Sequence, residues 1–478
     1  MKLQQACEIL TYLESDNDVN SLILDEVCIW PLVRQTIWFQ LLAVDNEKIP
    51  NSVPNKSLTT KINKKIKSIL SVRRNSISES TIDDFIFVSR PVYLQEMSEG
   101  ICVDRIVDPL LSALPDKTSA LKIYTSKLDE TNHLQYKGMT VEPGALIAPV
   151  KIQADVLKKI HELINKTPLD KNRFLQKLTV NLDAYQKWRK VAEQVITGNN
   201  KIKAILLVGW YFPDMMAFVA TAKKYGTTTI DLQHGKQGKY QGMYSWWTRY
   251  PVNGYEQMPD YYWCWGKPSC DHIIQSNKPG RKEAVVAGYP WVDYYKNDMN
   301  KTHGPNSTDK RKRVLVTLQA AFGENVEPIP DFIVEYLRSS ESAQSHFVFR
   351  CHPNFVGCIS YIKNRLHDIS KEKYSVCDGT QNLYEAFIDS THHITAYSSC
   401  CYEASLFGIP TLLFGKDAYD IYHAEIARQM FDWTSGSKDE LSLWIKSASS
   451  QNININGENQ YIVSSLDLSR KLLANLSI

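Results

Sequence analysis

Residues 227–235 read Thr-Thr-Thr-Ile-Asp-Leu-Gln-His-Gly, and this stretch decides how the rest of the chain is interpreted. The β-branched residues 227–230 favour a strand, whereas the Asp, Gln and Gly that follow disfavour one. In open α/β sheets, ligands bind at the carboxyl ends of parallel strands. The stretch therefore predicts a strand that delivers Asp231, Gln233, His234 and Gly235 to a ligand site. The alternative is a polar turn that only caps a core strand.

Strands and helices alternate on both sides of this stretch. One βαβ unit consists of a strand at 204–208, a helix at 213–225 opened by Pro213-Asp214, and the strand at 227–231. Its crossover should be right-handed. Further strands are expected at 85–88, 121–125, 261–265 and 284–287. The pattern restarts after residue 312 with strands at 313–317, 347–350, 374–376, 393–396 and 411–414, and with helices at 329–340, 355–367, 383–389, 399–407 and 418–430. Such alternation predicts an α/β protein with parallel, doubly wound sheets.

A chain of 478 residues is too long for one hydrophobic core. We expect an N-terminal helical segment at 1–80, in which Pro31 separates two helices and Leu22 to Leu42 form apolar stripes at helical spacing. The predicted remainder is a Rossmann-like domain at 81–292 with a helical insertion at about 150–198, a polar linker at 293–312, a second Rossmann-like domain at 313–460 and a C-terminal helix at 461–478. The two Rossmann-like domains should face each other across a cleft.

Composition excludes several classes of protein. A net charge of +3 is too small to indicate nucleic-acid binding. No apolar run approaches the ~20 residues of a membrane span, and no signal peptide is recognisable. The ten cysteines lack a CxxC or zinc-like spacing, which predicts a reduced, cytoplasmic protein with buried thiols. The basic stretch 56–74 is either a peripheral contact with the inner membrane surface or a solvated helix face.

A second polar group follows the strand at 347–350. Arg350 and His352 are two residues apart, so in an extended chain they share one side. A guanidinium and an imidazole at a strand end suit a phosphate or diphosphate. The alternative is a histidine with a purely structural role.

A third polar group, Ser398 and Ser399, follows the strand at 393–396. Free amides at the start of the next helix would bind phosphate. If Ser399 caps that helix, Glu403 lies one position beyond a capping box and is left to bind a ribose diol. The alternative is a simple capped helix with an exposed glutamate. No phosphate loop, dinucleotide fingerprint, nucleophile elbow, His-Glu-x-x-His or Asp-x-Asp strand is present, so we expect phosphate binding without a metal or a cofactor.

Together, these motifs resemble those of GT-B glycosyltransferases of bacterial capsule and lipopolysaccharide O-antigen assembly. The matching pieces are Asp231-x-Gln-His-Gly235, Val286-Ala-Gly-Tyr-Pro290, His352-Pro353, and Ser398-Ser399 followed by Glu403 and Gly408-Ile-Pro410, all within residues 200–415. The closest likeness is to retaining transferases that use CMP-activated ulosonic acids, such as Kdo and pseudaminic acid transferases. The serine, glutamate and Gly-x-Pro pattern is shared with sugar epimerases of the same fold, and the Glu-Asp-Gly motif of several CMP-sugar transferases is absent.

The resemblance implies a nucleotide sugar, CMP-linked, held by the C-terminal domain. His352, helped by Arg350, would neutralise the departing phosphate, the amides of Ser398 and Ser399 would hold it, and Glu403 would bind ribose. A glycan or lipid-linked glycan acceptor would enter from the N-terminal domain, where Arg90, Gln233 and Gly235 are candidate contacts.

Asp231 would lie under the anomeric carbon, as the nucleophile of a retaining reaction or the general base of an inverting one. His234 would orient Asp231 or carry the acceptor proton. Both roles require Asp231 to face His352 and the serine pair across a gap open to solvent.

Three alternatives remain open. Two are enzymes on the same fold, a CDP-polyol phosphotransferase and an NDP-hexose transferase or epimerase. The third is a glycan-binding scaffold subunit without turnover. Aromatic residues between Tyr240 and Trp265 are interleaved with polar ones, which suits stacking on sugars or bases as well as core packing.

Overall fold

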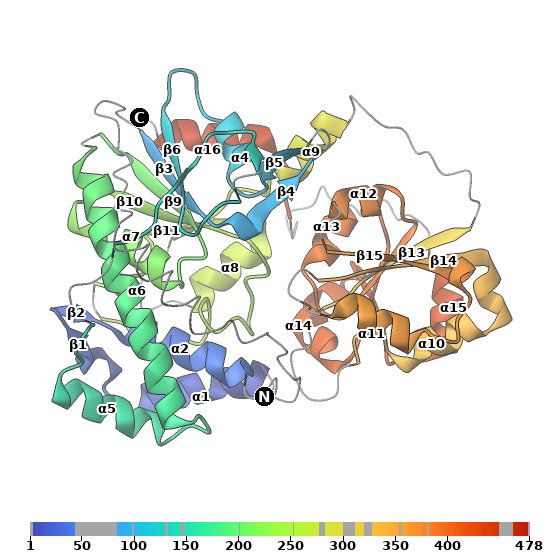
Figure 1. Ribbon diagram of the computed structural model, residues 1–478, viewed down its shortest axis with the longest axis horizontal. Helices are drawn as coiled ribbons and strands as arrows, with labels where there is room; N and C mark the ends of the chain where they lie inside the picture. The colour runs from blue at the N-terminus through green and yellow to red at the C-terminus, as the bar shows by residue number, and fades with distance from the viewer. Residues whose placement is uncertain are drawn as a thin grey trace, which may run out of the picture.

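The computed structural model contains two α/β units, one at each end of its long axis (Figure 1). It describes residues 3–43, 84–97, 100–129, 132–144, 149–199, 201–251, 253–276, 283–299, 311–319, 327–352, 355, 357–379, 382–448 and 462–476. The basic stretch 56–74 and Pro353 lie outside the described residues. In the ranges given, no helix combines the length and apolar character needed to cross a membrane.

The first unit is built on a seven-stranded parallel sheet in the order β12-β11-β10-β9-β3-β6-β8. Every residue of β3 and β9 is buried, as expected for strands covered on both faces. The strands are β3 Phe85–Ser89, β6 Ala120–Tyr124, β8 Met139–Thr140, β9 Ala204–Val208, β10 Thr228–Leu232, β11 Tyr261–Cys264 and β12 Glu283–Val286.

Helices cover this sheet. The long helix α6 Lys171–Thr197 packs on α7 Pro213–Lys224, which is the crossover between β9 and β10. Helix α5 Ala154–Ile164 precedes α6, so both lie in the stretch expected to be a helical insertion. The remaining helices of the unit are α1 Leu3–Asp16, α2 Trp30–Ala43, α4 Asp108–Ser112, α8 Lys267–Ser276 and α9 Trp291–Met299.

The N-terminal segment differs from its prediction in one place. Residues expected on a helical stripe form a hairpin of β1 Ile23–Leu24 and β2 Val27–Cys28. Its turn residues Asp25 and Glu26 have φ of 50° and 66°, as a two-residue hairpin turn requires. Pro31 does not separate two helices but lies in the first turn of α2, where its missing N–H breaks no helical bond.

A small sheet that the sequence did not reveal flanks the carboxyl edge of the large one. It consists of β4 Leu94–Glu96, β5 Ile101–Asp104 and β7 His133–Leu134. Strands β4 and β7 are too short for their periodicity to stand out in the sequence. Strand β5 places Arg105 beside the candidate site described below.

The second unit is a six-stranded parallel sheet in the order β15-β14-β13-β16-β17-β18. Its strands are β13 Lys312–Thr317, β14 Ser345–Arg350, β15 Tyr374–Cys377, β16 His392–Thr395, β17 Thr411–Phe414 and β18 Asp432–Thr434. Its helices are α10 Asp331–Arg338, α11 Cys358–Arg365, α12 Leu383–Ile388, α13 Cys400–Leu406, α14 Lys416–Ala427 and α15 Lys438–Ser447. Five strands and five helices fall where the sequence predicts them, whereas β18 and α15 were not predicted.

The chain finally returns to the first unit. Helix α16 Leu466–Leu476 packs beside α4, and Ser469 Oγ donates to the carbonyl of Ala287, 3.3 Å away. Figure 1 shows this helix in red beside the blue and cyan strands of the first sheet. The chain between the two units differs from the expected linker, because residues 293–299 belong to α9 and residues 300–310 lie outside the described part.

The two units share a buried aromatic contact. Tyr384 of α12 lies with its ring centroid 5.5 Å from that of Trp291 and 5.0 Å from that of Tyr295, both on α9. All three side chains are fully or almost fully buried. Apolar burial of this size holds the carboxyl edges of the two sheets together.

All ten cysteines are free thiols, and nine of them are buried, as predicted.

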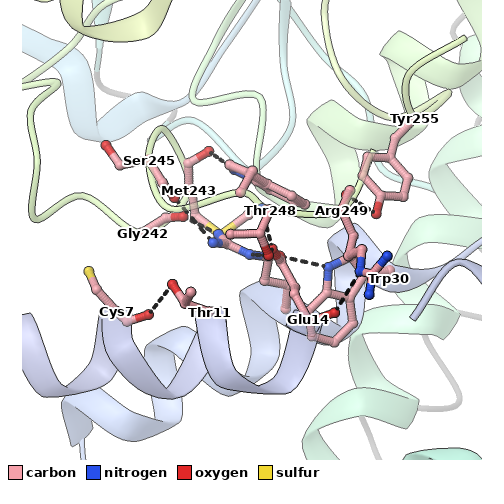
Figure 2. A network of polar contacts seen from close by, with 12 residues as sticks. Cys7, Thr11, Glu14, Trp30, Gly242, Met243, Ser245, Thr248, Arg249 and Tyr255 are labelled. Carbon is pink, nitrogen blue, oxygen red and sulfur yellow. Dashed lines mark hydrogen bonds and ion pairs between the residues drawn. The ribbon is translucent and has the colours of Figure 1, made fainter. Parts of the chain in front are cut away.

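A buried ion pair fixes the N-terminal helices to the loop after β10 (Figure 2). Arg34 Nε lies 2.8 Å from Glu14 Oε1, and neither side chain is exposed. The guanidinium also donates to the carbonyls of Gly242 and Ser245, and Thr248 donates to Glu14 Oε2 through its backbone N–H and its hydroxyl. Both charges are therefore surrounded by hydrogen-bond partners, which makes their burial tolerable.

Replacing Arg34 by methionine should lower the free energy of unfolding by about 3–5 kcal/mol, because Glu14 would be left as a buried, unpaired charge. Chemical denaturation followed by tryptophan fluorescence measures the change. Arg338→Met is the matched control, since its ion pair with Asp368 is solvent-exposed and should contribute no more than about 1 kcal/mol. Equal losses in the two variants would contradict the role given to Arg34.

Candidate active site

The carboxyl edge of the first sheet gathers aromatic, basic and imidazole side chains. His234 follows β10 and Tyr211 follows β9, and the Tyr211 hydroxyl lies 3.1 Å from His234 Nε2. Tyr93, from the turn after β3, places its ring edge-on to the imidazole with centroids 5.7 Å apart. Arg90, also after β3, pairs with Asp214 at 2.5 Å and is thereby held over this edge.

Burial lowers the pKa of His234 to about 4, and the nearby positive charges of Arg105 and Arg90 act in the same direction. The imidazole is therefore neutral at pH 7, with one nitrogen able to accept a proton. The residue is partly exposed, but its Nδ1 is buried, and its Nε2 is the nitrogen that contacts the Tyr211 hydroxyl.

Asp231 does not face an open gap, contrary to the sequence-based hypothesis. Its side chain has no exposed surface. Oδ1 accepts hydrogen bonds from the backbone N–H groups of Gly209 at 3.1 Å and Trp210 at 3.0 Å, and Oδ2 accepts one from the Tyr244 hydroxyl at 2.7 Å. With these donors in place, the carboxylate orders the loops after β9 and β10. Its geometry is that of a positioning residue and not of a nucleophile.

Gln233 and Gly235 shape the turn after β10. Gln233 is 3% exposed; its Nε2 donates to the Gly235 carbonyl at 2.8 Å, and its Oε1 accepts from the backbone N–H of Trp265 at 2.6 Å. The amide thus ties the end of β10 to the end of β11. Gly235 is partly exposed.

In the second unit, Arg350 is the last residue of β14 and His352 follows the strand, and both are partly exposed. Arg350 donates from one Nη to the carbonyl of Gly379, 3.3 Å away. Burial lowers the pKa of His352, and the charges of Arg350 and Arg105 lower it further. Arg105 belongs to the first unit, so its influence on His352 places the two units' polar groups close together.

The start of α13 differs in detail from its prediction. Ser398, and not Ser399, supplies the side-chain oxygen, which accepts the backbone N–H of Cys400 at 3.3 Å. Ser399 already has helical dihedral angles and makes no cap bond through its side chain. Burial is the main cause that raises the pKa of the Cys400 thiol, whereas Arg350 and Arg105 lower it, so both guanidiniums act at this helix end.

Glu403 is neither exposed nor free, and this differs from the expectation of an open ribose ligand. It is 3% exposed, and the Tyr384 hydroxyl donates to its Oε1. The same oxygen lies 3.9 Å from an Nη of Arg105. Arg105 therefore crosses from the first unit to a carboxylate of the second.

Sequence reasoning missed Arg105. Its loop is ordered by Asp104, whose Oδ1 accepts the backbone N–H groups of Ile106 at 3.0 Å and Val107 at 3.1 Å. An aspartate whose side chain accepts the backbone N–H groups two and three residues later is typical of a turn. Asp104 was therefore the sequence signal that could have pointed to this loop.

The site gathers basic side chains from both units. Arg105 of the first unit lies 3.9 Å from Glu403 of the second, and Arg350 and His352 stand at the end of β14 in the second unit. Guanidinium groups are suited to an anionic ligand such as phosphate. Within the described ranges, no group of three or more His, Cys, Asp or Glu side chains is arranged to hold a metal ion.

Comparison with known proteins identifies the fold. No protein-family model matches the chain, and no curated protein sequence matches it. Among solved structures, it is similar to a Listeria monocytogenes protein assigned as a UDP-N-acetylglucosamine 2-epimerase, with a TM-score of 0.52 and 13% identity over 83% of this chain and 96% of that one. It is also similar to the UDP-GlcNAc 2-epimerase of Methanocaldococcus jannaschii, with a TM-score of 0.51 and 12% identity over 82% and 99%. The fold is therefore GT-B, two Rossmann-like domains, as predicted.

Replacing Asp231 by alanine should lower the free energy of unfolding by at least about 2 kcal/mol, because each buried N–H left without an acceptor costs roughly 1–3 kcal/mol. Tyr244→Phe is the control, since it removes one donor and keeps the acceptor for Gly209 and Trp210; its loss should be about 1 kcal/mol. An Asp231→Ala protein as stable as wild type would favour the nucleophile hypothesis over the positioning role.

Acidification should destabilise the folded protein through His234. The pKa is about 4 when folded against an ordinary 6.5, so between these values the unfolded chain binds the extra proton and folding stability falls with pH. Above pH 6.5 His234 costs no stability, and the loss in free energy of unfolding reaches about 3 kcal/mol at most by pH 4. Denaturation of wild type and His234→Gln at pH 7, 5.5 and 4.5 tests this: the difference between their free energies of unfolding should change over that window. His367→Gln, at an exposed position, is the control and should leave the pH dependence unchanged.

Proposed function

We propose that the protein is a glycosyltransferase that uses a nucleotide-activated sugar. The observation that carries the proposal is the approach of Arg105, from the first unit, to Glu403 of α13 at 3.9 Å, in the unit whose strand β14 ends with Arg350 and is followed by His352. This arrangement suits the phosphate of a nucleotide leaving group. Solved proteins of the same fold that are named UDP-GlcNAc 2-epimerases act on such donors, which supports a nucleotide sugar as ligand.

In the proposed chemistry, the protein stabilises the charge of the transition state more than that of the bound substrate. As the bond to the sugar breaks, negative charge grows on the phosphate, and Arg105 and Arg350 stabilise it more strongly than in the ground state. Neutral His352 is able to donate a hydrogen bond to the same oxygens. No charge has to be created in the protein at that step.

On the acceptor side, we assign the proton-accepting role to His234 and not to Asp231. His234 is neutral, partly exposed and hydrogen-bonded to Tyr211, and it lies within the electrostatic influence of Arg105. Proton transfer by such a group typically contributes about 10²–10⁴-fold in rate. Asp231 supports it by holding the loops after β9 and β10.

The donor is proposed to be a CMP-linked ulosonic acid, on the resemblance of the sequence motifs, and the product a bacterial surface glycan. The competing assignment is an epimerase of a UDP-linked hexose, which the named structural neighbours favour. The two differ in the number of phosphates, the base and the need for an acceptor.

Nucleotide binding should raise the melting temperature of the full-length protein. At about 100 times Kd the added stability is roughly 2.7 kcal/mol, so CMP, CDP, UDP and GDP are compared at saturation. Arg350→Ala and Arg105→Met should each weaken binding of the preferred nucleotide by about 10-fold or more, since each removes a charged contact worth roughly 1.5–3 kcal/mol. Arg338→Met, far from the site on α10, is the control.

The Arg105 variant is the more specific test of a site shared by the two units, because Arg105 lies in the unit opposite the predicted nucleotide domain. Wild-type nucleotide affinity in both variants would contradict the proposal. Preference for CMP would favour the ulosonate donor. Conversion of a UDP-hexose without any acceptor would identify the epimerase instead.

A further inference from the structure

A cavity lies between the two units, and apart from Gln233 its lining residues differ from those of the candidate site. Its volume is about 600 Å³, and it is lined on one side by the loop after β10 and the start of α8, and on the other by Tyr402 and α14. A smaller cavity of about 190 Å³ shares Tyr240, Asp420 and Ile421 with it and extends to α1. Together they form one trough, which is large enough for a small-molecule ligand.

One wall of the trough is held rigidly in place. The loop 236–250 is anchored by Arg34, as described above, and by His272, whose Nε2 lies 2.5 Å from Ser245 Oγ. Trp246, in the same loop, has φ of 64°, a left-handed conformation that is strained for a bulky residue. Such strain persists only where surrounding contacts enforce it, and it is concentrated at functional sites.

The opposite wall is fixed to this loop by a lysine. Lys236 Nζ reaches across to Glu425 at 2.7 Å and to the carbonyl of Ile421 at 2.8 Å, and it lies 4.0 Å from the ring centroid of Tyr422. Both walls are therefore positioned before any ligand binds.

The charges of the 600 Å³ cavity balance. Three cationic side chains and three carboxylates line it: Lys236, Lys239 and Arg428 against Asp271, Asp420 and Glu425. A balanced lining does not favour a nucleotide or another polyanion, and it suits an uncharged polar occupant.

One polar group in the cavity, the Gln237 amide, is poorly paired. Gln237 is 4% exposed and lines the cavity, and its Nε2 makes no hydrogen bond of good geometry within the described residues; the Tyr244 hydroxyl is its neighbour, and burial raises the pKa of Tyr244 whereas this contact lowers it. Its Oε1 receives a weak bond from the Cys264 thiol at 3.8 Å. A buried amide donor that is poorly paired is unfavourable, and a ligand hydroxyl would satisfy it.

An exposed aromatic ledge continues the trough along α14. His423 lines the cavity, the Tyr419 ring lies 5.3 Å from it, and the Trp433 ring lies 5.0 Å from Tyr419. Tyr419 and Trp433 are 38% and 37% exposed. Partly exposed aromatic faces with a polar edge are suited to stacking on sugar rings.

We propose that this trough binds uncharged sugar units of the acceptor glycan. The assignment rests on the proposed function and extends it to the class of acceptor. The inner end of the trough reaches the ends of β10 and β11, where Gln233 and Trp265 line it, and His234 follows Gln233 in the chain. A glycan that enters over the aromatic ledge would thus extend toward the carboxyl edge of the first sheet.

Saturation-transfer NMR on the full-length protein tests the trough with three probes: maltotriose and triacetylchitotriose, which are uncharged, and trigalacturonate, which carries three carboxylates. We expect at least one uncharged probe to bind, and trigalacturonate to bind more weakly or not at all. Gln237→Met, which removes the amide, and Trp433→Ala, which removes the ledge, should each weaken binding of that probe at least about fivefold. Leu443→Ala, at a position 68% exposed on α15, should leave it unchanged.

The same variants are measured for nucleotide binding, which should stay at the wild-type level in all three. Three results would overturn the trough assignment: neither uncharged probe binds, trigalacturonate binds more tightly than both, or binding is unchanged in Gln237→Met and Trp433→Ala. Loss of nucleotide binding in Gln237→Met would overturn it as well, since the trough would then be a nucleotide site. If wild type binds no nucleotide, the proposed function itself fails, so the two failures are distinguishable.

Discussion

Arg105 is the residue on which the arrangement of the site depends, because it brings the positive charge of one sheet edge to the other. Its guanidinium lies 3.9 Å from Glu403 of the opposite unit, and Tyr384 donates to the same carboxylate oxygen. A guanidinium between two sheet edges is stable only if a carboxylate or a ligand anion balances it. Glu403 supplies that carboxylate.

The alternation of strands and helices was readable from sequence because buried parallel strands are continuous apolar runs of β-branched residues. Strand β9 has the predicted bounds, and most others differ by one or two residues. Strands β5 and β18 were missed, and length alone does not explain this, because β16 and β17 have four residues each and were predicted. The hairpin at 23–28 was missed because its apolar residues also fit a helical stripe, and only the left-handed turn at Asp25 and Glu26 distinguishes the two.

The site was predictable in position and less so in role. Polar residues at strand ends do collect at the carboxyl edges, and Arg350, His352 and His234 lie there, while their roles stay predictions. The role of Asp231 is harder to predict because a carboxylate after a strand has two physical uses: it binds a ligand, or it accepts the amides of the neighbouring loop. Its side-chain burial and its hydrogen bonds to Gly209 and Trp210 favour the second use, and both depend on contacts about 20 residues away in the chain.

The side chains of the candidate site and of the trough separate their proposed ligands. A nucleotide brings negative charge, which guanidinium groups such as those of Arg105 and Arg350 bind. A growing glycan has to move relative to the enzyme after each addition, and a lining whose charges already neutralise one another, as in the pair of Lys236 and Glu425, holds an uncharged chain without trapping it. His234 follows Gln233 in the chain, and its Nε2 lies 3.1 Å from the Tyr211 hydroxyl. In the proposed function, this neutral imidazole takes a proton from the acceptor while the guanidiniums stabilise the departing phosphate of the donor.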